Sequence, residues 1–285
     1  MPLTAIVLVL IAAGFHAGWN LLLHDTEDRE AAMAVAGIAT GLVLLPAMLI
    51  LRPWEALPLI VLAGLAHTLY SLGLAASYRR GMLAVTYPVA RGTAPLLVTI
   101  GGWLVLSERP SAWSALGAVL LCAGLALIAN VGRSAAQGKA ITFAVLTGVA
   151  IASYSLIDAR AVREVNPVGY LGAVFLLQGV FLAIWIRLTR QSLAHGAPRF
   201  SLARLTSGHG RYLRRSLRPG LLIGAGSTLA YLLVVFALQR ADAGRVTTLR
   251  EISILLGLAL SRQAFGRKAW LGAACVVAGV LLATL

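Results

Sequence analysis

Ten long runs of apolar residues constrain the fold of this 285-residue chain more than any other feature. A helix needs about 20 residues to cross the hydrocarbon core of a bilayer. Strands of a membrane barrel alternate apolar and polar residues over about ten positions, whereas these runs are continuously apolar. The sequence therefore predicts an all-α polytopic membrane protein with ten transmembrane helices. The runs cover residues 3–23, 31–51, 57–77, 83–106, 112–130, 139–160, 167–188, 219–239, 244–262 and 268–285.

The composition excludes several other classes of protein. Charged residues make up only 12% of the chain and apolar residues 59%, whereas soluble domains carry about 25% charged residues and disordered chains have low hydrophobicity and high charge density. The net charge is +14, but the excess Lys and Arg lies in short segments between apolar runs, which is typical of membrane-flanking charge. We therefore expect contact with the lipid bilayer and no nucleic-acid partner.

Similar residues recur in the two halves of the chain in the same order. The matches are Gly117 with Gly272 and Gly124 with Gly279 at an offset of 155, Tyr70 with Tyr231 at an offset of 161, and, more loosely, Trp19 with Tyr154. Chance similarity between Gly-rich apolar helices is the alternative explanation. Because five helices is an odd number, consecutive halves enter the membrane from opposite sides. The sequence thus predicts inverted five-helix repeats, residues 1–132 and 133–285, around a central cavity, as in secondary transporters.

Ionisable residues inside the predicted spans need a partner or a cavity, because a charge at membrane depth is costly. Arg91 lies in the fourth run, bracketed by Pro88 and Pro95, which predict a bend, and the adjacent Arg250 and Glu251 lie in the ninth run. Guanidinium groups pair bidentately with carboxylates, so the arginines are candidates to hold a zwitterionic solute. Alternatively, Glu251 neutralises an arginine in a purely structural set. The sequence leaves both readings open.

Other polar residues share helix faces at spacings of three or four. Such stripes occur in the first, third and fourth runs, and tyrosines of the second half supply counterparts. Single polar residues in membrane helices more often join helices to one another, but stripes on three helices favour a polar cavity with aromatic walls. The predicted solute-binding residues are His16, Asn20, His67, Tyr70, Tyr78, Tyr87, Arg91, Tyr154, Tyr231, Arg250 and Glu251.

Four short motifs distributed over the chain are typical of one family of membrane proteins. They are Phe15-His16-Ala17-Gly18-Trp19-Asn20, Tyr87-Pro88-Val89-Ala90-Arg91-Gly92, Leu106-Ser107-Glu108-Arg109-Pro110 and Leu249-Arg250-Glu251-Ile252-Ser253. With them the chain resembles the drug/metabolite transporter superfamily, specifically ten-helix carriers with two EamA-type repeats. The resemblance implies export of amino acids or other small metabolites without ATP hydrolysis. The second repeat departs from the pattern at Leu260-Ser261-Arg262, where the usual acidic residue is missing, which puts any gating role of that residue in doubt.

No motif predicts a cofactor, a metal or a catalytic set. The chain lacks His-Glu-x-x-His, Cys-x-x-Cys and Gly-x-Ser-x-Gly, the patterns of zinc sites and serine hydrolases, and both cysteines lie inside apolar runs. We expect a secondary transporter of a bacterial inner membrane, working by alternating access on a small-molecule solute. An intramembrane enzyme or a lipid-handling protein is the alternative. Proton coupling is left open, with Glu251 and His16 as candidates.

Positive charge is distributed unevenly among the connections between runs. Of the 24 Lys and Arg residues, 16 lie in connections after odd-numbered runs and 6 in the other connections. Because Lys and Arg concentrate in cytoplasmic loops, the count places the odd connections in the cytoplasm and both termini outside. The family resemblance implies cytoplasmic termini. The sequence leaves the orientation open, together with the identity of the solute and the oligomeric state.

Overall fold

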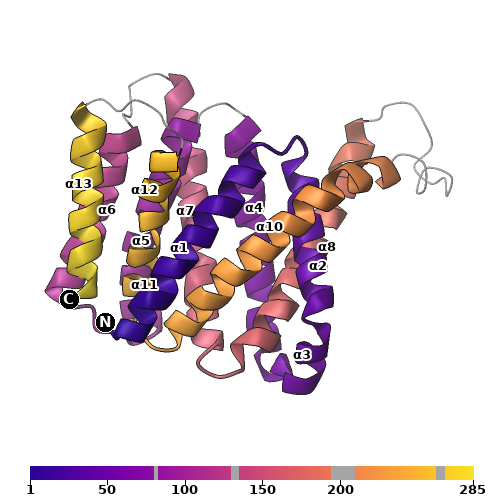
Figure 1. Ribbon diagram of the computed structural model, residues 1–285, viewed down its shortest axis with the longest axis horizontal. Coiled ribbons are helices and arrows are strands. Elements are labelled where there is room, and N and C mark those ends of the chain that lie inside the picture. The colour runs from indigo at the N-terminus through magenta and orange to yellow at the C-terminus, as the bar shows by residue number, and fades with distance from the viewer. Residues whose placement is uncertain (80–82, 130–134, 194–208, 261–266) are drawn as a thin grey trace.

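A computed structural model describes residues 1–79, 83–129, 135–193, 209–260 and 267–285 (Figure 1). These residues are predominantly helical and include no strand, so the prediction of an all-α fold is confirmed. Each predicted run coincides with one helix or with helices separated by a short break. The elements are α1 (Leu3–His24), α2 (Arg29–Val43), α3 (Leu45–Leu51), η1 (Pro53–Ala56), α4 (Leu57–Arg79), α5 (Leu83–Val105), α6 (Ala112–Ala129), α7 (Ala135–Ala161), α8 (Pro167–Leu193), α10 (His209–Leu238), α11 (Ala243–Arg250), α12 (Ile252–Leu260) and α13 (Arg267–Thr284).

The long helices lie side by side in one bundle, and the chain runs back and forth between its two ends (Figure 1). Helices from the two halves of the sequence interleave: α1 packs on α10, α4 on α7, α2 on α8 and α6 on α13. Both termini lie at the same end of the bundle, where the Met1 amine donates a hydrogen bond to the Thr284 carbonyl at 3.0 Å. Neither half of the sequence therefore forms a separate body.

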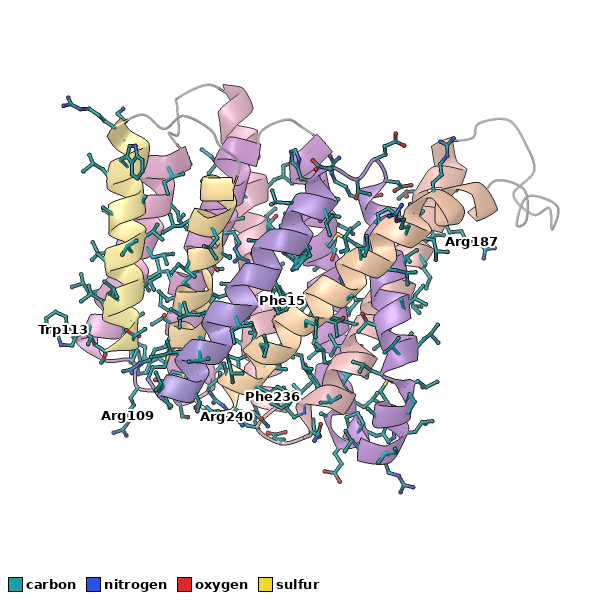
Figure 2. All side chains as sticks on the ribbon, in the orientation of Figure 1. Phe15, Arg109, Trp113, Arg187, Phe236 and Arg240 are labelled. Carbon is teal, nitrogen blue, oxygen red and sulfur yellow. The ribbon has the colours of Figure 1, made fainter. Side chains whose placement is uncertain are left out.

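Several helices are long and apolar enough to cross a membrane. Among the described residues six meet these criteria, or seven if α2 and α3 form one bent span. Large apolar side chains also remain exposed around the bundle, such as Trp113 at 55% and Phe15 at 42%. In Figure 2, Arg109 and Arg240 lie near the end that carries the termini, and Arg187 lies toward the opposite end. An apolar girdle between charged ends is the surface that a bilayer requires.

The helices are interrupted at two places, between α2 and α3 and between α11 and α12. Helices α2 and α3 meet at 50°, and Pro46 stands in the first turn of α3, where it lacks a donor and crowds the preceding turn. Helix α11 ends at Arg250 and α12 begins at Ile252, so the second break falls at Glu251. The two prolines of α5 lie inside one continuous helix, and Pro95 has no N–H to donate to the Arg91 carbonyl one turn earlier.

Glycines bring α6 and α13 into backbone contact. A Cβ added to Gly117 would lie 2.5 Å from the Gly279 carbonyl oxygen, and one on Gly279 would lie 2.6 Å from the Gly117 oxygen. Gly124 and Gly272 have the same reciprocal relation, at 2.6 and 2.5 Å. Any larger residue would collide with main chain at these positions. The prediction that these glycines form a close-packing surface, as small residues do in membrane helices, is confirmed.

Candidate solute-binding site

An internal cavity of about 60 Å³ lies between helices from both halves of the sequence. This volume holds a few water molecules. Residues from α1, α2, α4, α7, α8 and α10 line the cavity together with the last residue of α11. Six of the predicted residues lie on its wall: His16, His67, Tyr70, Tyr154, Tyr231 and Arg250. Residues from the stripes predicted on the first and third runs therefore lie on one cavity wall, whereas the fourth run contributes none of the described lining residues.

Aromatic rings form one wall of the cavity. The His67 ring stacks on Tyr154 with centroids 4.1 Å apart, at an interplanar angle of 17°. Tyr154 in turn lies 5.6 Å from Tyr70 and 5.8 Å from Tyr231, edge to face in both cases. Edge-to-face pairs of this kind are favourable geometries for aromatic rings. The two tyrosines that match across the halves thus flank a single central ring.

Arg91 is held by three side chains beside this cavity. Its Nε donates to the Glu251 carboxylate at 2.6 Å, and its Nη2 donates to Ser253 Oγ at 3.1 Å. Its Nη1 lies 3.0 Å from Nε2 of His16, and because guanidinium only donates, this imidazole nitrogen accepts. His16 is therefore neutral in this arrangement. Arg91 joins α1, α5 and the break between α11 and α12.

Arg250 is buried as deeply as Arg91 but has a different environment. Its side chain is 2% exposed, and its Nε and Nη2 find no hydrogen-bond partner among the described residues. The neighbouring Glu251 is 4.0 Å away, beyond hydrogen-bond distance. The guanidinium carbon lies 6.0 Å from the centre of the Tyr154 ring. Buried donors without acceptors are costly, so Arg250 brings two unsatisfied donors to the wall of the cavity.

A second charged cluster, centred on Asp158, was missed from the sequence. Asp158 is completely buried, and its carboxylate accepts hydrogen bonds from the hydroxyls of Tyr170, at 2.6 Å, and of Tyr231. Nε2 of His67 lies 2.9 Å from the same carboxylate. The available signal was the cost of an ionisable residue inside a predicted span, the same argument that selected Arg91, because Asp158 lies within 139–160. Asp158 was not selected because it lies near the end of that span, close to Arg160, where charged residues are common.

The remaining predicted residues have other surroundings. Asn20 donates to the His16 carbonyl of its own helix at 2.8 Å. The side chains of Tyr78 and Tyr87 fall outside the part of the chain that the structure describes. The role of all eleven predicted residues in solute binding stays a prediction. Among the described residues, no group of three or more His, Cys, Asp or Glu side chains is placed to hold a metal ion.

Glu108, in the motif after α5, ties the two halves together near the end that carries the termini. Its carboxylate accepts the Ala243 N–H at 3.0 Å, at the start of α11, and pairs with Arg163. A positive φ of 56° at Ser107, together with hydrogen bonds from the Leu106 and Glu108 amides to the Gly102 carbonyl, turns the chain so that Glu108 points inward. This is the hydrogen-bond pattern of a helix C-cap.

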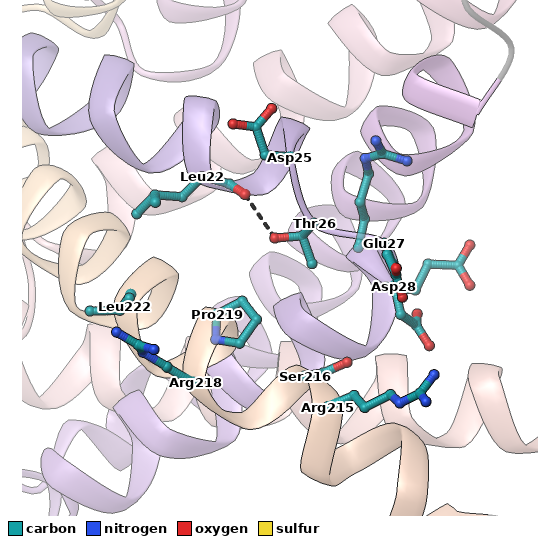
Figure 3. Close-up of a pocket in the computed structure, with 12 residues that line it drawn as sticks. Leu22, Asp25, Thr26, Glu27, Asp28, Arg215, Ser216, Arg218, Pro219 and Leu222 are labelled. Carbon is teal, nitrogen blue, oxygen red and sulfur yellow. Dashed lines mark hydrogen bonds between the residues drawn. The ribbon is translucent and has the colours of Figure 1, made fainter.

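At the opposite end of the bundle an open depression of about 740 Å³ lies between the α1–α2 connection and α10 (Figure 3). Acidic residues of the connection, such as Asp25 and Asp28, and basic residues of α10, such as Arg215 and Arg218, line it. The Thr26 hydroxyl donates to the Leu22 carbonyl at 2.7 Å and continues α1 into this rim. The depression is therefore a polar surface of mixed charge.

Comparison with known proteins identifies the family of this chain. No curated protein matches it in sequence. The chain is similar to a protein of known crystal structure, with a TM-score of 0.72 and 17% identity over 100% of this chain and 97% of the other. At that identity the likeness shows the fold alone. The model of the EamA-like transporter family matches residues 138–285, more than half of the chain. This multi-pass membrane protein therefore belongs to the EamA-like transporter family.

Proposed function

We propose that the protein is a secondary transporter that exports amino acids or similar small metabolites by alternating access. The observation that carries the proposal is the buried Arg250 guanidinium on the wall of an aromatic-lined cavity, with two N–H donors that have no hydrogen-bond partner among the described residues. A carboxylate supplies the acceptors that this guanidinium lacks. The aromatic wall offers a surface for the rest of the solute.

The proposed architecture is ten transmembrane helices in two inverted repeats, residues 1–132 and 133–285. The packing of helices supports it. In the two repeats α1 corresponds to α7, α2 to α8 and α4 to α10. Exchanging the repeats therefore converts the contact between α1 and α10 into the contact between α7 and α4. The same exchange leaves the contact between α2 and α8 unchanged. A two-fold axis in the membrane plane produces this relation, as in known carriers with inverted repeats.

Matched residues support the same axis. Gly117 contacts Gly279, and the repeat offset of 155 converts this pair into Gly272 and Gly124, which also contact each other. Tyr70 and Tyr231, matched at an offset of 161, both line the cavity. A cavity on the axis between repeats is where inverted-repeat carriers bind their solutes. The break at Glu251 adds a discontinuous helix beside that position.

The route from the cavity to one side of the membrane runs, in this proposal, along α1 and α10. Trp19 and Ile223 line the cavity, and Leu22 and Leu222 on the same two helices line the open depression. Alternating access then requires α1 and α10 to separate while the α6–α13 contact stays closed. We place the protein in a bacterial inner membrane, where the Lys and Arg of one side face the cytoplasm.

Transport by purified protein in liposomes tests the proposal. Radiolabelled amino acids, monocarboxylates and amines are offered in parallel, and the solute is recovered chemically unchanged. Arg250→Gln is expected to lower transport of carboxylate solutes by about 10-fold to 100-fold, because a hydrogen bond to a charged group contributes about 1.5–3 kcal/mol. Transport of amines should change far less. Arg240→Gln, at an exposed position, is the matched control.

Two outcomes contradict the proposal. Equal loss of transport for all solute classes in a stable Arg250→Gln protein would remove the carboxylate-binding role. Recovery of a chemically altered solute would instead favour the intramembrane enzyme.

A further inference from the structure

The Asp158 cluster joins four helices around one carboxylate. Asp158 belongs to α7, and its donors are His67 of α4, Tyr170 of α8 and Tyr231 of α10. Its side chain is 0% exposed. Acidic residues at such depth are expensive and mark ion or proton pathways. Among the residues that the structure describes, this is the buried carboxylate that no guanidinium neutralises.

The groups around the cluster narrow the choice of a proton acceptor. Glu251 is paired with Arg91, and His16 accepts from the same guanidinium, so both are held in their present protonation states. The neighbouring cation is Arg250, whereas Arg160 of α7 is exposed and pairs with Glu164. The other titratable groups that face the cluster are the phenols of Tyr70, Tyr154, Tyr170 and Tyr231. His67 and Asp158 therefore remain as the candidate proton acceptors.

The geometry of the pair suits the binding of one additional proton. A carboxylate only accepts hydrogen bonds, so a neutral His67 donates through Nε2 to Asp158. A proton from water then adds either to the second nitrogen of His67 or to the carboxylate, and the hydrogen bond between the two groups remains in either case. His67 itself lines the cavity. Water in the cavity thus reaches the pair.

We propose that the His67–Asp158 pair is a proton-binding site, and that its occupancy is coupled to an anion bound beside Arg250. The coupling to an anion rests on the proposed transport function, whereas the proton-binding site does not. Arg91 and Arg250 balance Glu251 and Asp158 in this buried region when both histidines are neutral. An entering anion adds a negative charge, which one proton on the pair cancels.

The two sites are close enough for this coupling to be measurable. Both contact Tyr154: the ring centroids of His67 and Tyr154 are 4.1 Å apart, and the Arg250 guanidinium carbon lies 6.0 Å from the centre of the Tyr154 ring. Charges about 10 Å apart at an effective dielectric constant of about 20 change each other's binding by roughly tenfold. By linkage, a bound proton raises anion affinity by the same factor. The anion and the proton then move together.

The first experiment needs no solute. The infrared spectrum of the membrane-reconstituted protein is recorded from neutral to acidic pH. We expect a carboxyl or imidazole protonation signal in the wild type that disappears in Asp158→Asn and in His67→Gln. Glu164→Gln, which removes an exposed carboxylate in the turn after α7, should retain it. If Asp158→Asn fails to fold, His67→Gln carries the test. A signal that persists in both variants, or is absent from the wild type, overturns the proton site.

The second experiment tests the coupling with benzoate as the anion. Binding to the purified protein is followed together with proton uptake from weakly buffered solution, using a pH-indicator dye. We expect about one proton per benzoate, an affinity about tenfold higher when the pair is protonated, and no pH dependence in Asp158→Asn. Benzoate binding without proton uptake overturns the coupling. A protein that titrates normally but neither binds nor transports any carboxylate contradicts the proposed function and leaves the proton site standing.

Discussion

Arg91 and Glu251 lie 160 residues apart in the chain, yet the guanidinium Nε donates to the Glu251 carboxylate at 2.6 Å. Both side chains are essentially excluded from solvent, at 1% and 0% exposure. The pair links α5 to the break between α11 and α12. It therefore joins the two halves of the sequence beside the cavity.

Removing the charge of Glu251 should destabilise the protein. In Glu251→Gln the Arg91 guanidinium loses its carboxylate, and breaking a buried pair from one side costs about 3–5 kcal/mol. Thermal unfolding in detergent measures the loss. Glu164→Gln is the control, because it breaks an exposed pair with Arg160 of a kind that contributes about 0–1 kcal/mol. Equal unfolding temperatures for the wild type and Glu251→Gln would show that the pair is dispensable.

The indole N–H of Trp19 provides a test of the cavity that keeps an aromatic side chain at this position. Trp19 lines the cavity, and its Nε1 is buried with no partner among the described residues. In Trp19→Phe the aromatic ring remains and the donor is lost, so affinity for a carboxylate solute should fall by about twofold to tenfold. Trp54→Phe, on the exposed η1 segment, should leave affinity unchanged. An unaltered affinity in Trp19→Phe would exclude this donor from the site.

The α6–α13 contact should be intolerant of even one methyl group. Gly117→Ala places a Cβ against the Gly279 carbonyl, and overpacking of this kind costs about 1–3 kcal/mol. Gly14→Ala and Gly18→Ala on α1 are matched controls, because nothing lies within 4 Å of an added Cβ there. These controls should be neutral or gain up to about 1 kcal/mol from helix propensity. Melting temperatures that rank the three variants otherwise would contradict the backbone contact.

Glu108 should contribute to stability through its contacts with two other segments. Glu108→Gln weakens the pair with Arg163 and the bond from the Ala243 amide, with an expected loss of about 1–3 kcal/mol. Glu55→Gln, an exposed carboxylate on η1, is the control in the same unfolding assay. If both variants unfold like the wild type, Glu108 is not a tie between the halves.

Orientation is testable with a pair of cysteine probes, one at each end of the bundle. In a background with both Cys122 and Cys275 replaced by Ser, Asp25→Cys and Arg109→Cys each carry one exposed thiol. The charge count predicts that an impermeant thiol reagent labels Arg109→Cys in intact cells and spares Asp25→Cys. The reverse pattern would show that the orientation implied by the family resemblance holds. Labelling after cell lysis confirms that both thiols are reactive.

The apolar runs predicted the helices well, because the length of a membrane span is fixed by the bilayer and by the rise of a helix. Stripes at spacings of three and four placed His16, His67 and Tyr70 on the cavity wall for a similar reason. Periodicity reports which residues share a face, and polar faces of membrane helices turn away from lipid. Both properties are local to one helix.

Side-chain contacts between different helices could not be predicted from the periodicity of single helices. Arg91 and Arg250 look equivalent in the sequence, yet Arg91 forms hydrogen bonds with three side chains, whereas Nε and Nη2 of Arg250 have no hydrogen-bond partner among the described residues. The difference depends on residues contributed by other helices. The break at Glu251 was not predicted either, because neither Gly nor Pro marks it. Asp158 went unnoticed because its partner His67 lies 91 residues earlier in the chain.

The long separation between Arg91 and Glu251 has a consequence for how the protein is made. At about 5–20 residues per second, a ribosome needs roughly 8–32 s to reach Glu251 after it has added Arg91. During that interval the growing chain carries a guanidinium whose carboxylate has not been synthesised. Ser253, a second partner of Arg91, also lies later in the chain, whereas His16 on α1 precedes it. The order of synthesis thus makes His16 available to Arg91 before Glu251 and Ser253 exist.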